Sequence, residues 1–83
     1  MKRYTRKIDD GKYEITDLTK ATESLAKFED LYDYVMKCEL TIPEELAKLR
    51  LNGKEKSYRF KEIMGHKLMN ASFIILLNRF GIK

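Results

Sequence analysis

The stretch Ala71-Ser72-Phe73-Ile74-Ile75-Leu76-Leu77-Asn78-Arg79-Phe80-Gly81-Ile82 decides how the rest of the chain has to fold. Successive residues of a helix are about 100° apart, so the uninterrupted apolar run from Phe73 to Leu77 points all round a helix and no single flat surface covers it. We therefore expect a helical module that packs against itself or against a partner. The predicted oligomer or partner-binding interface consists of Phe73, Ile75, Leu76, Leu77 and Phe80.

The length of 83 residues predicts one domain, residues 1–83. A core of this size supplies only about 3–5 kcal/mol unless disulfides, a metal or oligomerisation reinforce it. Cys38 is the one cysteine, which excludes an internal disulfide, and one cysteine with one histidine cannot supply the three or four ligands of a structural zinc. We expect no metal and no cofactor, and a homo-oligomer or a complex with a host protein.

The cysteine content and the N-terminus predict the compartment. A lone cysteine is typical of a reducing interior, and Met1-Lys2-Arg3-Tyr4 leads into charged residues instead of the apolar region of a secretory leader. No apolar run approaches the roughly 18 residues that span a bilayer. We expect a cytoplasmic protein of the host cell with no membrane span.

Residues 1–16 contain a hairpin signal. Asp10-Gly11 separates two short runs with aromatic and β-branched residues, and such a pair favours a type I′ turn, in which both central residues have positive φ. Two strands alone are marginal in water, so the alternative is a partly disordered basic arm.

The remaining residues, 17–83, form the predicted helical body. An apolar seam at steps of three and four predicts a first helix over about 18–38, capped by Asp17 or Thr19. Thr41-Ile42-Pro43-Glu44 has the features of a second helix start, because Thr41 and Glu44 can form a capping box and Pro43 is tolerated in a first turn. That helix spans about 43–51.

A third helix is predicted over about 56–80. Ser57 is a candidate N-cap, and Gly81 followed by Ile82 fits a Schellman stop. The fold class is therefore mainly α, with an N-terminal β-hairpin or arm followed by three helices.

The candidate catalytic groups do not form a recognisable site in the sequence. Cys38 ends an apolar seam and is interpreted as a small buried hydrophobe, whereas His66 falls on the solvent side of the last helix. There is no Gly-rich phosphate loop. We expect a protein that is not an enzyme and has no catalytic residues.

The charge of the chain opens an alternative. The net charge is +4, and residues 54–83 carry seven basic and two acidic side chains. The helix at 43–51, the break at Asn52-Gly53 and the basic start of the next helix resemble a helix-turn-helix in outline. The predicted nucleic-acid-binding residues of this alternative are Lys54, Lys56, Tyr58, Arg59 and Lys61. A further alternative is an interfacial helix with Phe73 to Leu77 in lipid.

Two short patches resemble a group of known proteins. Leu25-Ala26-Lys27-Phe28-Glu29-Asp30, followed by Thr41-Ile42-Pro43-Glu44-Glu45-Leu46, is similar to small uncharacterised proteins of phages, prophages and related mobile elements of Gram-positive bacteria. The resemblance covers roughly residues 12–50. It implies an accessory protein that binds and blocks a host or defence protein, as an anti-CRISPR protein does, and it transfers no catalytic residue.

Overall fold

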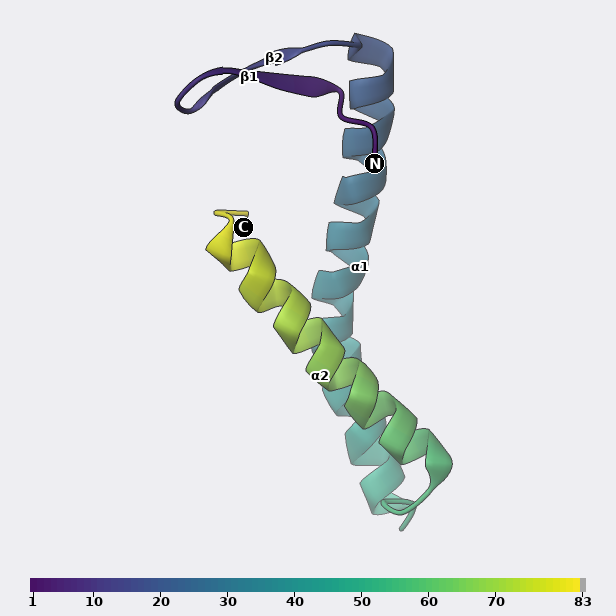
Figure 1. Cartoon of the computed structure of the whole chain (residues 1–83). Coiled ribbons are helices and arrows are strands. Elements are labelled where there is room, and N and C mark those ends of the chain that lie inside the picture. The colour runs from purple at the N-terminus through teal and green to yellow at the C-terminus, as the bar shows by residue number, and fades with distance from the viewer. Residues whose placement is uncertain (83) are drawn as a thin grey trace. The chain divides into compact units, whose positions relative to one another are not determined.

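The computed structural model describes residues 1–82 and is mainly helical, with an N-terminal two-stranded antiparallel hairpin as predicted. The elements are β1 (Thr5–Asp9), β2 (Lys12–Ile15), α1 (Leu18–Leu51) and α2 (Tyr58–Arg79) (Figure 1). The chain divides into two compact units whose boundary falls inside α1, after Tyr32. Neither helix within residues 1–82 has the length and apolar character needed to cross a membrane.

The hairpin differs from the predicted type I′ geometry. Thr5 pairs with Ile15 and Lys7 with Tyr13, but Asp9 then pairs with Lys12, which leaves one extra residue in β1. Gly11 has a φ of 75°, and no residue other than glycine has a positive φ among residues 1–82. A type I′ turn would need a second residue with positive φ. Here the extra residue in β1 adapts the strands to the turn instead.

The prediction of three helices is wrong, because residues 18–38 and 43–51 belong to one continuous helix, α1. Thr41 is not an N-cap, and Pro43 lies in the helix interior. Pro43 has no N–H to donate to the Glu39 carbonyl, and such an interior proline costs about 3 kcal/mol.

Packing on both sides of the proline offsets that cost. Cys38, Ile42 and Leu46 follow one another at four-residue steps on one side of α1, and all three are buried, with exposed fractions of 6%, 4% and 2%. They form one cluster with Ile63 of α2. A break at Pro43 would divide this cluster, so tertiary contact overrides the local start signal.

The two helix starts follow the predicted capping chemistry. The backbone N–H of Lys20 donates to Asp17 Oδ1 at 3.0 Å, and that of Phe60 donates to Ser57 Oγ at 3.2 Å. Asp17 and Ser57 thus satisfy N–H groups that have no partner within their helices.

Both helices end in Schellman motifs. Gly53 and Gly81 have φ values of 67° and 77°. The N–H of Lys54 donates to the Leu49 carbonyl at 2.8 Å, and the N–H of Ile82 donates to the Leu77 carbonyl at 2.9 Å. Glycine meets the left-handed conformation that these stops require.

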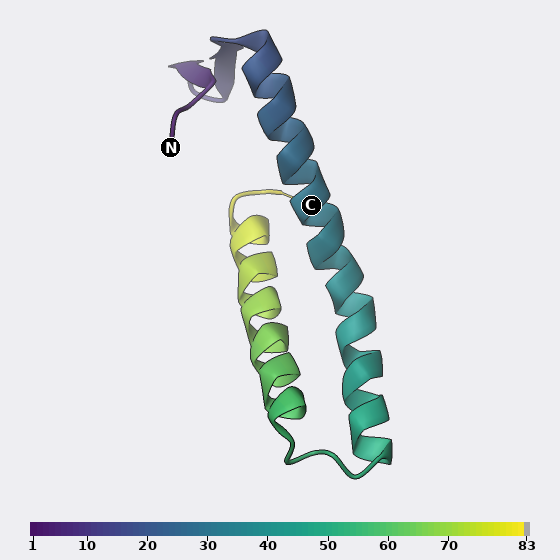
Figure 2. The same cartoon turned by 90° about the vertical axis from the view of Figure 1, so that its right-hand side faces the viewer.

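In the second unit, α2 runs back past the end of α1 in the opposite direction and crosses it at an angle (Figures 1 and 2). Phe60, Met64 and Leu49 pack around the buried cluster. A polar side chain also lies in this interface: Asn70 is 4% exposed, and its Nδ2 donates to the Val35 carbonyl at 3.2 Å and to Glu39 Oε1 at 2.8 Å. The buried amide is therefore satisfied.

Candidate functional site

The side of α2 that faces away from the buried cluster carries a set of exposed apolar side chains, which we call the outer face. At about 100° per residue they fall within a sector of about 140°, opposite Ile63 and Asn70. Their exposed fractions range from 48% to 81%. The outer face consists of Tyr58, Leu68, Met69, Ile75, Leu76 and Phe80.

Charged side chains of the outer-face sector lie near its two ends. Lys61 and Glu62, the latter paired with Arg59, lie near its beginning and Arg79 near its end, whereas residues 68–78 contain no charged side chain. Gly65 and Ser72 share the same sector and are small, so the backbone of α2 is accessible between the larger side chains. A helix of a partner could approach the backbone of α2 closely there.

The summed area of the outer face is large for exposed apolar residues. The exposed fractions of its six residues, of which Tyr58 is set apart from the other five by Lys61 and Gly65, add up to an accessible area on the order of 700 Å². The largest apolar patch of a typical monomer is about 300–600 Å², and each partner of a standard protein complex contributes about 800 Å². The outer face is therefore large enough for a specific protein contact.

The outer face overlaps the interface predicted from the sequence without being identical to it. Ile75, Leu76 and Phe80 are exposed at 60%, 48% and 75%, whereas Leu77 is 7% exposed and belongs to the interior. Phe73 is half-buried.

Sequence reasoning missed three members of the outer face, Tyr58, Leu68 and Met69. The spacing of Ile63, Asn70 and Leu77 at seven-residue steps marks the buried side, but the signal is hidden because its central residue is polar.

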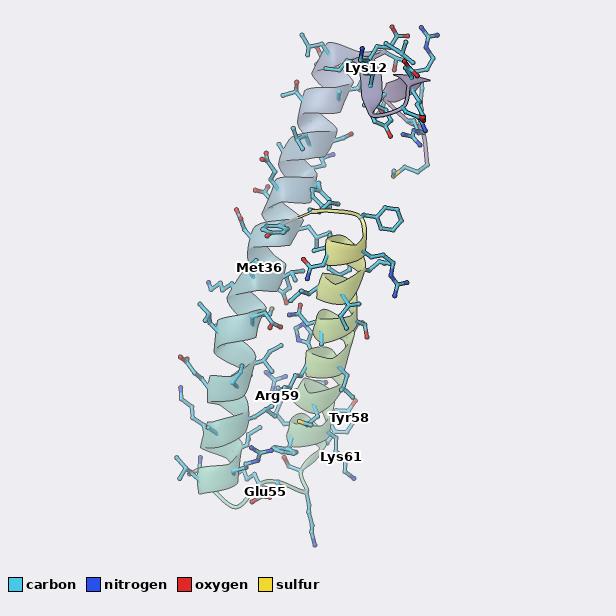
Figure 3. All side chains as sticks on the ribbon, turned by 90° about the vertical axis from the view of Figure 1, so that its left-hand side faces the viewer. Lys12, Met36, Glu55, Tyr58, Arg59 and Lys61 are labelled. Atoms are coloured by element: carbon cyan, nitrogen blue, oxygen red, sulfur yellow. The ribbon has the colours of Figure 1, made fainter. Side chains whose placement is uncertain are left out.

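The residues of the nucleic-acid alternative do not lie together on one helix start. Lys54 and Lys56 are in the connection before α2, because α2 begins at Tyr58. Tyr58 and Lys61 point away from α1, whereas Arg59 points toward it (Figure 3).

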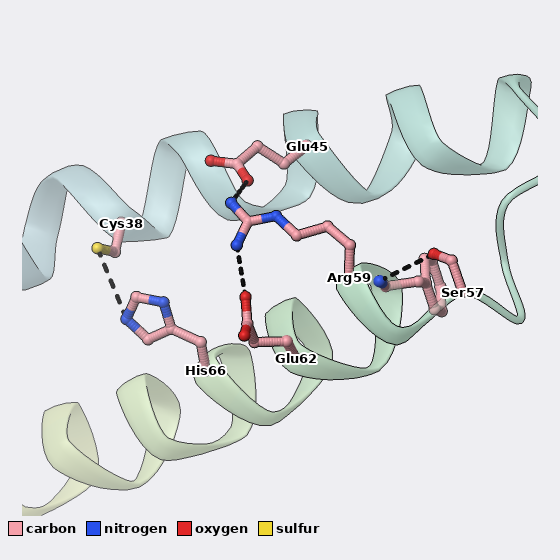
Figure 4. A network of polar contacts seen from close by, with 7 residues as sticks. Cys38, Glu45, Ser57, Arg59, Glu62 and His66 are labelled. Carbon is pink, nitrogen blue, oxygen red and sulfur yellow. Dashed lines mark hydrogen bonds and ion pairs between the residues drawn. The ribbon is translucent and has the colours of Figure 1, made fainter.

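Arg59 is paired with two carboxylates. Its guanidinium donates to Glu62 Oε1 at 2.5 Å and to Glu45 Oε2 at 3.4 Å (Figure 4). No ion pair among residues 1–82 involves Lys54, Lys56 or Lys61. These lysines, not Arg59, are the free cations of this region within the described residues.

A polar pocket of about 430 Å³ lies between α1 and α2 in the second unit. On its wall, His66 Nε2 lies 4.0 Å from Cys38 Sγ, and the His66 ring stacks on Tyr34 with 6.4 Å between centroids. Cys38 is buried, as expected, whereas His66 is half-buried and so departs from the predicted solvent-facing position. Contact with Cys38, and to a smaller extent Glu45, raises the pKa of Tyr34 above its ordinary value.

The described residues of the second unit thus form a helical hairpin with an exposed apolar face on α2 and a thiol–imidazole pair between its two helices. Comparison of the chain with models of protein families, with curated proteins and with solved structures gives no match.

Proposed function

We propose that this chain is a non-catalytic protein-interaction module that binds a partner protein through the outer face of α2. The observation that carries this proposal is the size of that face, which leaves about 700 Å² of largely apolar surface in water. Burial of such a face is favourable by about 25 cal/mol per Å² before the costs of association. A partner therefore gains affinity mainly from the aromatic and aliphatic side chains at its centre.

The charges at the ends of the outer face favour a foreign partner over a second copy. In an antiparallel pair of α2 helices, Lys61 of one copy would lie near Arg79 of the other, and in a parallel pair each would meet itself. Either arrangement brings like charges together, which opposes association. The complementary partner carries an apolar strip, such as one side of an amphipathic helix, bordered by acidic residues at both ends.

The biological setting of the proposal comes from the sequence patches at residues 25–30 and 41–46. Their resemblance to small phage and mobile-element proteins supports an accessory protein that binds and blocks a host or defence protein inside the host cell. Blocking needs no catalytic group, since occupation of the partner's surface is sufficient.

The experiment is affinity capture from a nuclease-treated lysate of a Gram-positive bacterium, with three versions of the chain. Wild type is compared with Leu76→Glu, which places a charge in the outer face, and with Leu51→Glu, which places the same charge at a residue that is 87% exposed at the end of α1. We expect a protein retained by wild type and Leu51→Glu and lost with Leu76→Glu. Its release by moderate salt would support the acidic border.

Two outcomes contradict the proposal. Equal capture by all three versions would show that the outer face does not take part in binding. The second outcome would come from light scattering: if wild type is a stable dimer that Leu76→Glu converts to a monomer, the outer face binds a second copy of the chain instead of a foreign partner.

The alternative function, binding of DNA or RNA, is favoured by the free lysines at positions 54, 56 and 61. It predicts a gel shift at low salt that weakens steeply with added salt and is lost in the Lys54→Glu, Lys56→Glu double variant. Absence of a shift with wild type at low salt would exclude it.

A further inference from the structure

A thiol and an imidazole face each other across the two helices of the second unit. Cys38 projects from α1 and His66 from α2, and the Sγ and Nε2 atoms are 4.0 Å apart (Figure 4). Cys38 is 6% exposed and His66 is half-buried. The proposed protein-binding role uses neither side chain, and the two residues are 28 positions apart in the sequence, so only the helix pairing brings them together.

The surroundings of the pair combine an apolar wall with an open polar side. Ile42 and Ile63 line the pocket and are 4% and 5% exposed. Thr41 and Lys37 line it as well, and both Cys38 and His66 belong to the lining of this pocket of about 430 Å³. The ring of Tyr34 stacks on the imidazole.

The number of ligands restricts which ion fits. Among residues 1–82, no group of three or more histidine, cysteine or carboxylate side chains could hold a metal. Zinc prefers four ligands in structural sites and three in catalytic sites, so this chain alone does not provide a zinc site. A soft monovalent cation requires fewer ligands, and thiolate is a donor that Cu(I) favours.

The distance and the charge of the pair agree with such an ion. If the bond lengths of zinc, about 2.3 Å to sulfur and about 2.0 Å to nitrogen, serve as a guide, the donor atoms are about 3.5 Å apart at a tetrahedral angle and about 4.3 Å apart in a straight line. The observed 4.0 Å lies between these values. A thiolate, a neutral imidazole and a monovalent cation sum to zero charge, which lowers the cost of burial beside Ile42 and Ile63.

We propose that Cys38 and His66 form a two-ligand site for a soft monovalent cation of the Cu(I) type. Binding replaces the thiol proton, which leaves to solvent, with a bond from Sγ to the cation, and Nε2 supplies the second bond as a neutral donor. No electron is transferred in this step. The bound ion joins α1 to α2 at the middle of their contact.

The test is a titration of the purified chain with Cu(I), kept reduced by ascorbate under anaerobic conditions, in competition with a chromogenic Cu(I) chelator. We expect one Cu(I) per chain. Cys38→Ser should abolish this binding, and His66→Gln should weaken it by at least about tenfold, because a cysteine alone lacks the second donor. Met36→Leu, which removes a thioether of α1 that lies outside both the pocket and the outer face, is the matched control and should bind as wild type does.

A second measurement separates a lost site from a misfolded variant. Circular dichroism establishes that each variant is helical, and the unfolding temperature is then recorded with and without one equivalent of Cu(I). Wild type and Met36→Leu should unfold at a higher temperature with Cu(I), and folded His66→Gln should not. Equal Cu(I) affinity of wild type and His66→Gln, or binding abolished by Met36→Leu, would overturn the proposal.

Discussion

Replacement of Pro43 by alanine tests the continuity of α1 directly. Pro43 lies inside the helix, and its side chain is exposed, so the substitution creates no cavity. Alanine supplies the missing N–H to the Glu39 carbonyl and removes the clash of the ring with the preceding turn, a gain of about 3 kcal/mol. Loss of the proline restraint on the unfolded chain offsets about 0.4–1 kcal/mol of it.

The expected net result is a stabilisation of about 2 kcal/mol. Each kcal/mol shifts the unfolding temperature of a domain of this size by about 4–8 °C, so we expect Pro43→Ala to unfold about 10 °C above wild type. Urea unfolding followed by far-UV circular dichroism gives the free energy, and the slope with urea should stay unchanged. Glu44→Ala, at the next exposed position, is the control and should lie within about 0.5 kcal/mol of wild type.

A second substitution distinguishes the continuous helix from the two helices that the sequence favoured. If Thr41 capped a separate helix, Thr41→Ala would cost about 1 kcal/mol. In a continuous α1, Thr41 is an interior residue, and alanine should be neutral or slightly stabilising. A destabilised Thr41→Ala together with an unchanged or less stable Pro43→Ala would refute a helix that runs through Pro43.

Three further predictions concern single residues. Gly65→Ala should stabilise the chain by about 1 kcal/mol, because its added Cβ meets nothing within 4 Å. Gly53→Ala should destabilise the chain, because Gly53 has a φ of 67°. Urea unfolding of the two variants measures this difference in stability. Asn70→Ala should cost about 1–3 kcal/mol in the same assay, since two hydrogen bonds are lost, one to the Val35 carbonyl and one to Glu39, each contributing about 0.5–1.5 kcal/mol. A cost near zero would contradict the assigned hydrogen bonds. When wild type and Tyr34→Phe are titrated by absorbance, the difference between the two, which reports ionised Tyr34, should appear above pH 10.0, since the pKa of Tyr34 is raised. The stabilisation of the fold by neutral Tyr34 is complete below that pH. It is lost as the pH rises through the folded-state pKa.

Local chemistry predicted the parts of the fold that depend on a few neighbouring residues. The hairpin, the Asp17 and Ser57 caps and the glycine stops follow from side chains within four positions of one another. The start signal at Thr41 to Glu44 is equally local, but it competes with a buried seam that Cys38 and Leu46 form across it. The outcome depends on α2, which is distant in sequence, and so a local pattern cannot decide it.

The candidate site was predictable only in part for a related reason. The run from Phe73 to Leu77 indicates a helix with uncovered apolar surface, but it does not indicate which side of the helix is covered. That depends on Asn70, a polar residue whose partners on α1 lie 31 and 35 positions away. Nothing near Asn70 in the sequence predicts those partners, so the positions of Leu68 and Met69 could not be assigned.

The same asparagine limits how α2 can slide along α1. A shift by one helical turn moves a side chain by about 5.4 Å, which would carry the Asn70 amide out of reach of the Val35 carbonyl and of Glu39 and leave the buried amide without these acceptors. Leucines alone would tolerate such slippage, since one apolar contact replaces another. The amide thus gives the helix pair a single alignment, and a binding partner meets a surface whose shape is already set before contact.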